Sequence, residues 1–230
     1  MEVAMARNTA RGSRPPSSRQ RPARRRGGAG QAALDQRRQQ VAQDAARLLA
    51  EGGGADYTRA KLKAAQRLGY RDEASLPHNT DVERALLDYR RLFQPDAGDV
   101  LHQAREAALE AMEFLAPFQP RLAGPVMDGT ADASTPVTLH LHSEDPDAVP
   151  RFLAQHAIPA EPGERTVRLD RARRGRFPAW HLEAGGVGFD LVVLPLAVLR
   201  QAPLSPVDER PMQRASAAQL RRTLEGPAGD

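Results

Sequence analysis

The sequence predicts an α+β protein in which an N-terminal helical region is followed by a mixed β-sheet with flanking helices. Between residues 31 and 118, apolar side chains recur every three or four positions, which is the period of a helix with one buried face. After Pro120, apolar and polar residues alternate, which is the period of a strand with one buried face. The change of period therefore divides the chain into a helical part and a sheet-containing part.

Four helices are predicted in the first part, at residues 31–49, 57–68, 80–93 and 99–116. Glycines follow the first two helices, and Pro117 stops the fourth, since proline cannot continue a helix. The third helix is expected to begin with a capping box formed by Thr80 and Glu83. Its apolar stripe, which we expect to be core, consists of Val82, Leu86, Tyr89 and Phe93.

Five strands are predicted in the second part, at residues 121–127, 137–142, 166–170, 178–184 and 187–194. Gly185 and Gly186 are expected to join the last two strands by a tight turn. Short helices at residues 147–156 and 216–224 complete an α/β domain that spans residues 119–226. In the second strand, alternation places Val137, Leu139 and Leu141 on one face and Thr138, His140 and His142 on the other.

Residues 1–30 are predicted to form a disordered tail, because they mix Arg, Ser, Pro and Gly with few large apolar side chains. Eight arginines against Glu2 give this tail a charge of +7, so the remainder carries −3 of the chain's total of +4. The tail could bind phosphates through counterion release. An organellar transit peptide and a solvated tail without a role are alternative interpretations.

Several function classes are excluded by residues that the sequence lacks. There is no cysteine, which removes disulfides, thiolate metal sites and cysteine nucleophiles. No phosphate-binding loop ending in Gly-Lys-Ser/Thr, no Gly-x-Ser-x-Gly and no His-Glu-x-x-His occurs. The sequence has no apolar run of the roughly 20 residues that a membrane span needs. We therefore expect a soluble protein of the cytoplasm, without a membrane partner.

The segment from Arg121 to His142 carries the most informative motif. Gly124 precedes Pro125, a loop follows with Gly129 and Thr130, and the next strand begins with Thr135-Pro136-Val137-Thr138. This arrangement, with Asp190 on a later strand, resembles the nucleotidyltransferase superfamily of the DNA polymerase β type. In that superfamily a Gly-Ser pair and a glycine-containing loop lead to a Ser-Asp-x-Asp signature. The Leu-His ending and the helical part, around residues 57–65 and 76–79, resemble one bacterial branch.

The resemblance implies a degenerate member of that superfamily. Its members use alternate carboxylates on one strand to hold two Mg²⁺ ions. Here Pro136 and Thr138 stand at the two paired carboxylate positions, and Asp190 matches the third. Gly124, Gly129 and Thr130 match the nucleotide loop. The resemblance therefore implies a nucleotidyltransferase-like mixed sheet that lacks two of three metal carboxylates, with Mg²⁺ as a cofactor only if the chain is active.

A second kind of site is suggested by two histidines on one strand face. His140, His142 and Asp190 could form a two-histidine, one-carboxylate site for a transition metal. The alternative is a hydrogen-bonded or solvent-facing pair of histidines without a ligand. The sequence alone favours the latter, because such pairs are common on half-exposed sheets.

Three functions are left open by the sequence, together with the substrate and the oligomeric state. The leading prediction is a catalytically inactive nucleotidyltransferase-like protein that binds a nucleotide or nucleic acid. The second is an active, divergent nucleotidyltransferase that recruits other ligands such as Asp128, Asp132 or Asp190. The third is a structural or protein-interaction module.

Overall fold

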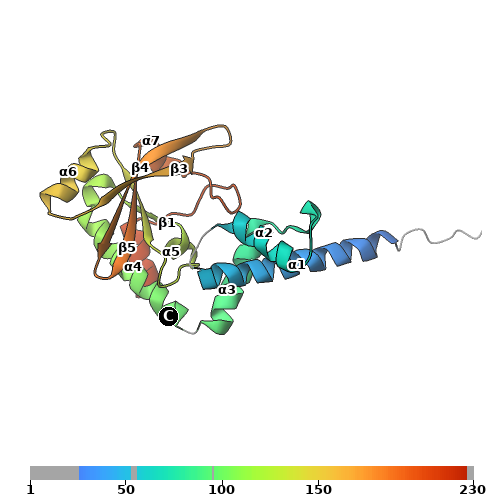
Figure 1. Ribbon diagram of the computed structural model, residues 1–230. Helices are drawn as coiled ribbons and strands as arrows, with labels where there is room; N and C mark the ends of the chain where they lie inside the picture. Colours follow the sequence, from blue (N-terminus) through green and yellow to red (C-terminus); the bar gives the residue numbers. More distant parts are fainter. Residues whose placement is uncertain (1–25, 53–55, 95, 227–230) are drawn as a thin grey trace, which may run out of the picture.

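The computed structural model describes residues 26–52, 56–94 and 96–226. Its fold is α+β, with a helical bundle beside a five-stranded mixed sheet and its flanking helices (Figure 1). In the described part of the chain, no helix combines the length and the hydropathy required to cross a bilayer. The predicted disorder of residues 1–25 lies outside the described residues, whereas residues 26–30 belong to the first helix rather than to a tail.

The helical bundle consists of α1 (Arg26–Gly52), α2 (Tyr57–Arg67) and α3 (Asn79–Phe93), with a 3-10 turn, η1 (Glu73–Ser75), between the last two. Asp56 caps α2 as predicted, since its side chain accepts a hydrogen bond from the Arg59 backbone at 2.9 Å. The bundle has its own small core, which contains mostly alanines and a few larger side chains, including Val41, Leu49, Val82 and Leu86.

The third helix differs from the sequence prediction at both ends. It begins at Asn79, and the Asp81 carboxylate accepts a hydrogen bond from the His78 backbone at 3.2 Å, so the predicted box of Thr80 and Glu83 is wrong. At the other end Phe93 is 66% exposed instead of buried. The helix extends beyond the neighbouring helices there, so its apolar stripe continues onto the surface.

The sheet has the order β1-β2-β5-β4-β3, with β2 parallel to β5 and all other pairs antiparallel. The strands are β1 (Arg121–Ala123), β2 (Val137–His142), β3 (Glu161–Arg168), β4 (Arg174–Ala184) and β5 (Val187–Leu194). The predicted bounds of β2 and β5 are confirmed. The glycine turn between β4 and β5 is also confirmed, and both glycines have the positive φ that favours glycine (+59° and +78°).

Three of the predicted strands have wrong bounds. The strand expected at 121–127 ends at Ala123, because Gly124 takes a φ of +70° and Pro125 then starts the short helix α5 (Pro125–Asp128). The strand expected at 166–170 corresponds to β3, which begins earlier, at Glu161, and ends at Arg168. The strand expected at 178–184 corresponds to β4, which begins earlier, at Arg174. β3 is the edge strand of the hairpin that it forms with β4, and most of its side chains are exposed, so alternation did not reveal the full extent of these two strands.

Helices cover one face of the sheet. α4 (Ala97–Phe114), α6 (Ala148–Gln155) and α8 (Ala217–Glu225) surround the main core, which includes Met112, Leu122, Leu139, Leu191 and Leu220. Figure 1 shows α4 and α8 lying together against the sheet. The opposite face carries a smaller apolar cluster, which contains Val192, Leu194 and Val198 of α7 (Ala197–Arg200). The candidate site lies on this second face.

Candidate functional site

A cleft of about 350 Å³ lies between the helical bundle and the sheet. It brings together five of the residues that the sequence singled out, since Gly124, Thr130, Pro136, Thr138 and Asp190 all line it. Gly129 does not line the cleft. It follows the last residue of α5 with a φ of +80°, a conformation that favours glycine at the end of a helix. The remaining walls are contributed by α1, α2, α3, α5, β3 and the segment after α7.

The strand register explains why two of these residues meet. Thr138 on β2 pairs directly with Asp190 on the parallel strand β5, so their side chains lie on the same face. Gly124 approaches Thr138 from β1, since a side chain at Gly124 would begin 3.6 Å from the Thr138 hydroxyl oxygen. The Asp190 carboxylate therefore has a hydroxyl as its neighbour on β2, where a second carboxylate would be needed to share a divalent ion.

Asp190 is already bound by two basic side chains. It is 4% exposed, and one carboxylate oxygen lies 2.5 Å from Nδ1 of His181 on β4. The other oxygen accepts a hydrogen bond from Nη2 of Arg165 on β3, whose side chain is 51% exposed. Charge-assisted hydrogen bonds of this kind are strong. The guanidinium of Arg165 thus neutralises the carboxylate that the resemblance assigns to a metal ion.

Gly163 gives the His181 ring the space for this contact. A methyl group at Gly163 would lie 2.6 Å from Nε2 of His181, so the ring would have to move away from Asp190. We expect Gly163→Ala to destabilise the protein by about 1 to 2 kcal/mol, the cost of a hydrogen bond to a charged group. Urea unfolding should detect this loss. In a His181→Ala background the same substitution should cost less than about 0.5 kcal/mol, and an equal cost in both backgrounds would contradict the explanation.

Arg90 of α3 connects the helical bundle to the loop after α5. Its side chain is 7% exposed, and Nη2 donates to the Asp132 carboxylate at 3.0 Å while Nη1 donates to the Thr130 carbonyl. Asp132 also accepts hydrogen bonds from Ser134 and Thr135, which lower its pKa although burial alone would raise it. Asp132 is therefore a structural partner of Arg90 rather than an available metal ligand.

Part of the cleft wall is acidic. Glu83 of α3 and Asp128 of α5 line it, and Asp208 lies beside them in a neighbouring hollow. Within the described residues, neither Glu83 nor Asp128 forms an ion pair. Although Asp128 is partly exposed, loss of hydration at the cleft wall and the charge of Asp208 raise its pKa to about 6. Burial, followed by the negative charges of Glu83 and Asp128, raises the pKa of Tyr57 to about 12.

The two histidines of β2 lie outside the cleft and do not join Asp190. His140 pairs with Val192 in the sheet register, and its buried Nδ1 atom has no hydrogen-bond partner among the described residues. His142 places Nδ1 3.0 Å from the Gln119 carbonyl, while its Nε2 faces Arg214 at 3.4 Å. Across the portion of the chain that is described, no three His, Asp or Glu side chains are placed to share a metal ion.

Burial keeps both of these histidines neutral. Burial, followed by the charges of Arg214 and of the neighbouring His142, lowers the pKa of His140 to about 3. Burial also lowers the pKa of His142 to about 4, against the opposing effect of its hydrogen bond to Gln119. The structure thus favours a pair of packed histidines over the predicted metal site.

The sequence did not indicate that residues 205–212 contribute to the cleft wall. Ser205, Val207 and Met212 line the cleft from a turn in which the Ser205 amide donates to the Arg210 carbonyl at 2.7 Å. Asn79 at the start of α3 donates to the Pro206 carbonyl at 3.0 Å, which connects this turn to the helical bundle. Two prolines and a serine at residues 205–211 predict a turn, but no local pattern indicates what the turn contacts.

Comparison with protein-family models, with curated proteins and with solved structures finds no match to this chain.

Proposed function

We propose that this chain is a nucleotidyltransferase-like protein that binds a nucleotide, free or within a nucleic acid, in the cleft between its helical bundle and its sheet, without transferring it. The observation that carries the proposal is that other side chains already bind the carboxylate of Asp190. This residue shares the cleft with Pro136 and Thr138, and Arg165 and His181 bind its carboxylate. A divalent ion would have to displace a guanidinium and would find a single carboxylate there, which disfavours two-metal chemistry.

The size and walls of the cleft agree with a small polar ligand. Its volume of about 350 Å³ lies in the range of ligand pockets. Leu49, Leu86 and Met212 provide apolar surface, whereas Thr138 and Arg165 provide hydrogen-bond donors. We expect the phosphates to lie toward the half-exposed guanidinium of Arg165, because the acidic wall at Glu83 and Asp128 would repel them.

Nucleotide binding by the purified chain should therefore not require a divalent ion. Isothermal titration calorimetry with the four nucleoside triphosphates, in EDTA and in Mg²⁺, measures this directly. We expect binding in both conditions and a loss of at least about tenfold in affinity in Arg165→Ala, since a charge-assisted contact is removed. Arg174→Ala is the matched control, because this exposed arginine belongs to the same hairpin but does not line the cleft.

The same preparations should incorporate no labelled nucleotide into RNA, protein or small acceptors. Turnover that disappears in Asp190→Ala would overturn the inactive assignment. Absence of binding in both EDTA and Mg²⁺ would exclude the nucleotide as a ligand of the cleft.

A divergent enzyme is the second candidate, and the unpaired carboxylates favour it. Glu83 and Asp128 face the same cleft without a basic partner among the described residues, so Asp128 is the available ligand for a cation, whereas Asp132 is occupied by Arg90. This enzyme would show Mg²⁺-dependent turnover that is lost in Asp128→Asn and retained in Asp190→Asn. The opposite pattern would assign the activity to Asp190 instead.

A further inference from the structure

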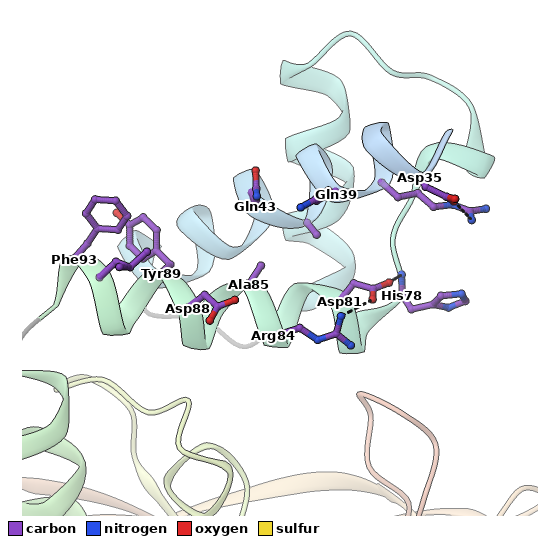
Figure 2. A pocket seen from close by; sticks show the side chains of 13 residues that line it. Asp35, Gln39, Gln43, His78, Asp81, Arg84, Ala85, Asp88, Tyr89 and Phe93 are labelled. Atoms are coloured by element: carbon purple, nitrogen blue, oxygen red, sulfur yellow. Dashed lines mark hydrogen bonds and ion pairs between the residues drawn. The ribbon is translucent and has the colours of Figure 1, made fainter. Parts of the chain in front are cut away.

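A second hollow lies on the helical bundle, and it is lined by residues of α3 other than those that line the cleft. It is a groove of about 640 Å³ between α1 and α3. Figure 2 shows Asp35, His78 and Asp81 at one end and Tyr89 and Phe93 at the other, with Gln39 and Gln43 of α1 along one side. The two helices therefore form an open channel that runs along α1.

One end of this groove is strongly apolar and exposed. Leu92 is 68% and Phe93 66% exposed, and the Phe93 ring packs on Tyr89 with a centroid distance of 4.9 Å. Isolated exposed apolar residues are common, but a group of adjacent aromatic and aliphatic side chains beside a groove is typical of a docking surface. Aromatic faces of this kind bind proline rings and the planar guanidinium of arginine.

The lining of the groove has one more carboxylate than guanidinium groups. It includes three carboxylates, from Asp35, Asp81 and Asp88, and two guanidinium groups, from Arg38 and Arg84. Among the described residues, the ion-pair partner of each carboxylate is an arginine three residues away on its own helix, at 3.7, 3.9 and 3.3 Å. Asp35 and Asp81 also accept hydrogen bonds, from the Gln31 side chain and the His78 backbone. Exposed pairs of this type contribute little stability, so another arginine can replace them at low cost.

The chain itself supplies a segment with the matching chemistry. Residues 14–25 read RPPSSRQRPARR, with five arginines, three prolines and no acidic residue. They directly precede Arg26, the first residue of α1, which forms one wall of the groove. Tethering to that wall gives this segment an effective concentration in the millimolar range at the groove, without any second molecule.

The length of this segment also matches the groove. From Arg26 to Gln43, α1 rises about 26 Å at 1.5 Å per residue. An extended chain that turns back at Arg26 covers the same distance in about eight residues, at roughly 3.3 Å each. Ser18 would then lie level with Gln43, and Pro15 and Pro16 would reach the aromatic end of the groove.

We propose that residues 14–25 dock in the groove between α1 and α3. Pro15 and Pro16 contact Tyr89 and Phe93, and the arginines lie beside the groove carboxylates. This inference does not depend on the ligand of the cleft. Docking would give the basic N-terminal segment an intramolecular partner. A polyanion that binds the same arginines would then have to displace the segment from the groove.

The absence of cysteine from the sequence allows a direct test in the full chain. A Ser18→Cys, Gln43→Cys double variant places one thiol in the segment and one in the groove. Under mild oxidation we expect a disulfide within one chain, formed at least about tenfold faster than in the control pair Ser18→Cys, Gln66→Cys. Gln66 is an equally exposed glutamine on α2 that does not line the groove.

Adding Leu92→Ser and Phe93→Ser to the first pair should reduce its rate to that of the control. Both side chains are largely exposed, so these variants are expected to retain the fold, which circular dichroism can verify. Equal rates for the two cysteine pairs would overturn the proposal. Disulfides that form mainly between two chains, with a rate that rises with protein concentration, would also overturn it and assign the groove to a second copy.

Discussion

Arg90→Met is expected to cost about 3 kcal/mol of unfolding free energy, one of the two largest effects that the structure predicts. The substitution removes the hydrogen bonds to Asp132 and to the Thr130 carbonyl, and it leaves a carboxylate that is 18% exposed without its cation. Breaking a buried pair from one side is costly because the remaining charge is uncompensated. Urea unfolding, followed by circular dichroism and by fluorescence of the single tryptophan Trp180, measures the change.

The neighbouring arginine supplies the control for this prediction. Arg91 is 78% exposed and pairs with Asp88 on the surface, so Arg91→Met should change the unfolding free energy by less than about 0.5 kcal/mol. In an Arg90→Met, Asp132→Asn double variant, the loss of unfolding free energy should be smaller than the sum of the losses in the two single variants, because no charge is left unpaired. A similar cost for Arg90→Met and Arg91→Met would show that Arg90 does not link the bundle to the loop.

Acidification is expected to produce the second large effect, through His140 and His142. In the unfolded chain these histidines take up protons below about pH 6.5, whereas burial holds their folded pKa values at about 3 and about 4. The unfolded state therefore binds more protons, and the stability falls as the pH decreases from 6.5 toward 4. At pH 4.5 the loss relative to pH 7.5 should be about 2 kcal/mol for each histidine.

His140→Phe isolates one half of this effect. Because Nδ1 of His140 has no hydrogen-bond partner in the part of the chain that the structure describes, an apolar ring of similar shape can replace the imidazole without leaving the partner of Nδ1 unsatisfied. We expect the dependence of stability on pH between 7.5 and 4.5 to weaken by about 2 kcal/mol in this variant. His102→Gln, at an exposed position of α4, should leave the dependence unchanged. An unaltered pH dependence in His140→Phe would mean that His140 is protonated in the folded protein.

The sequence predicted the helices and strands in which buried side chains recur at a regular spacing. β2 and β5 have one face in the main core, so Val137, Leu139 and Leu141 and their counterparts on β5 recur every second residue. The four helices show the period of 3.6 for the same reason. Where both faces of an element are exposed, as along much of β3, the alternation disappears and the predicted bounds were wrong.

Part of the candidate site was also accessible from the sequence. Gly124, Pro136, Thr138 and Asp190 were selected through a resemblance, and all four line one cleft. The pairing of β2 with β1 on one side and with β5 on the other brings them together. The predicted metal site of His140, His142 and Asp190 did not assemble. Strand alternation placed both histidines on the correct face, but it could not show that His140 is opposite Val192 rather than Asp190.

The sequence by itself thus determined the fold class, the order of the elements and the face of the sheet on which the polar residues lie, because these depend on the local period of burial. Only the tertiary structure decided which side chains meet. Arg165 on β3 reaches Asp190 on β5 past the strand between them, and Arg90 of α3 reaches Asp132 in the loop after α5. Such contacts join residues far apart in sequence, and their selection depends on the free energy of the whole packed arrangement rather than on any local pattern.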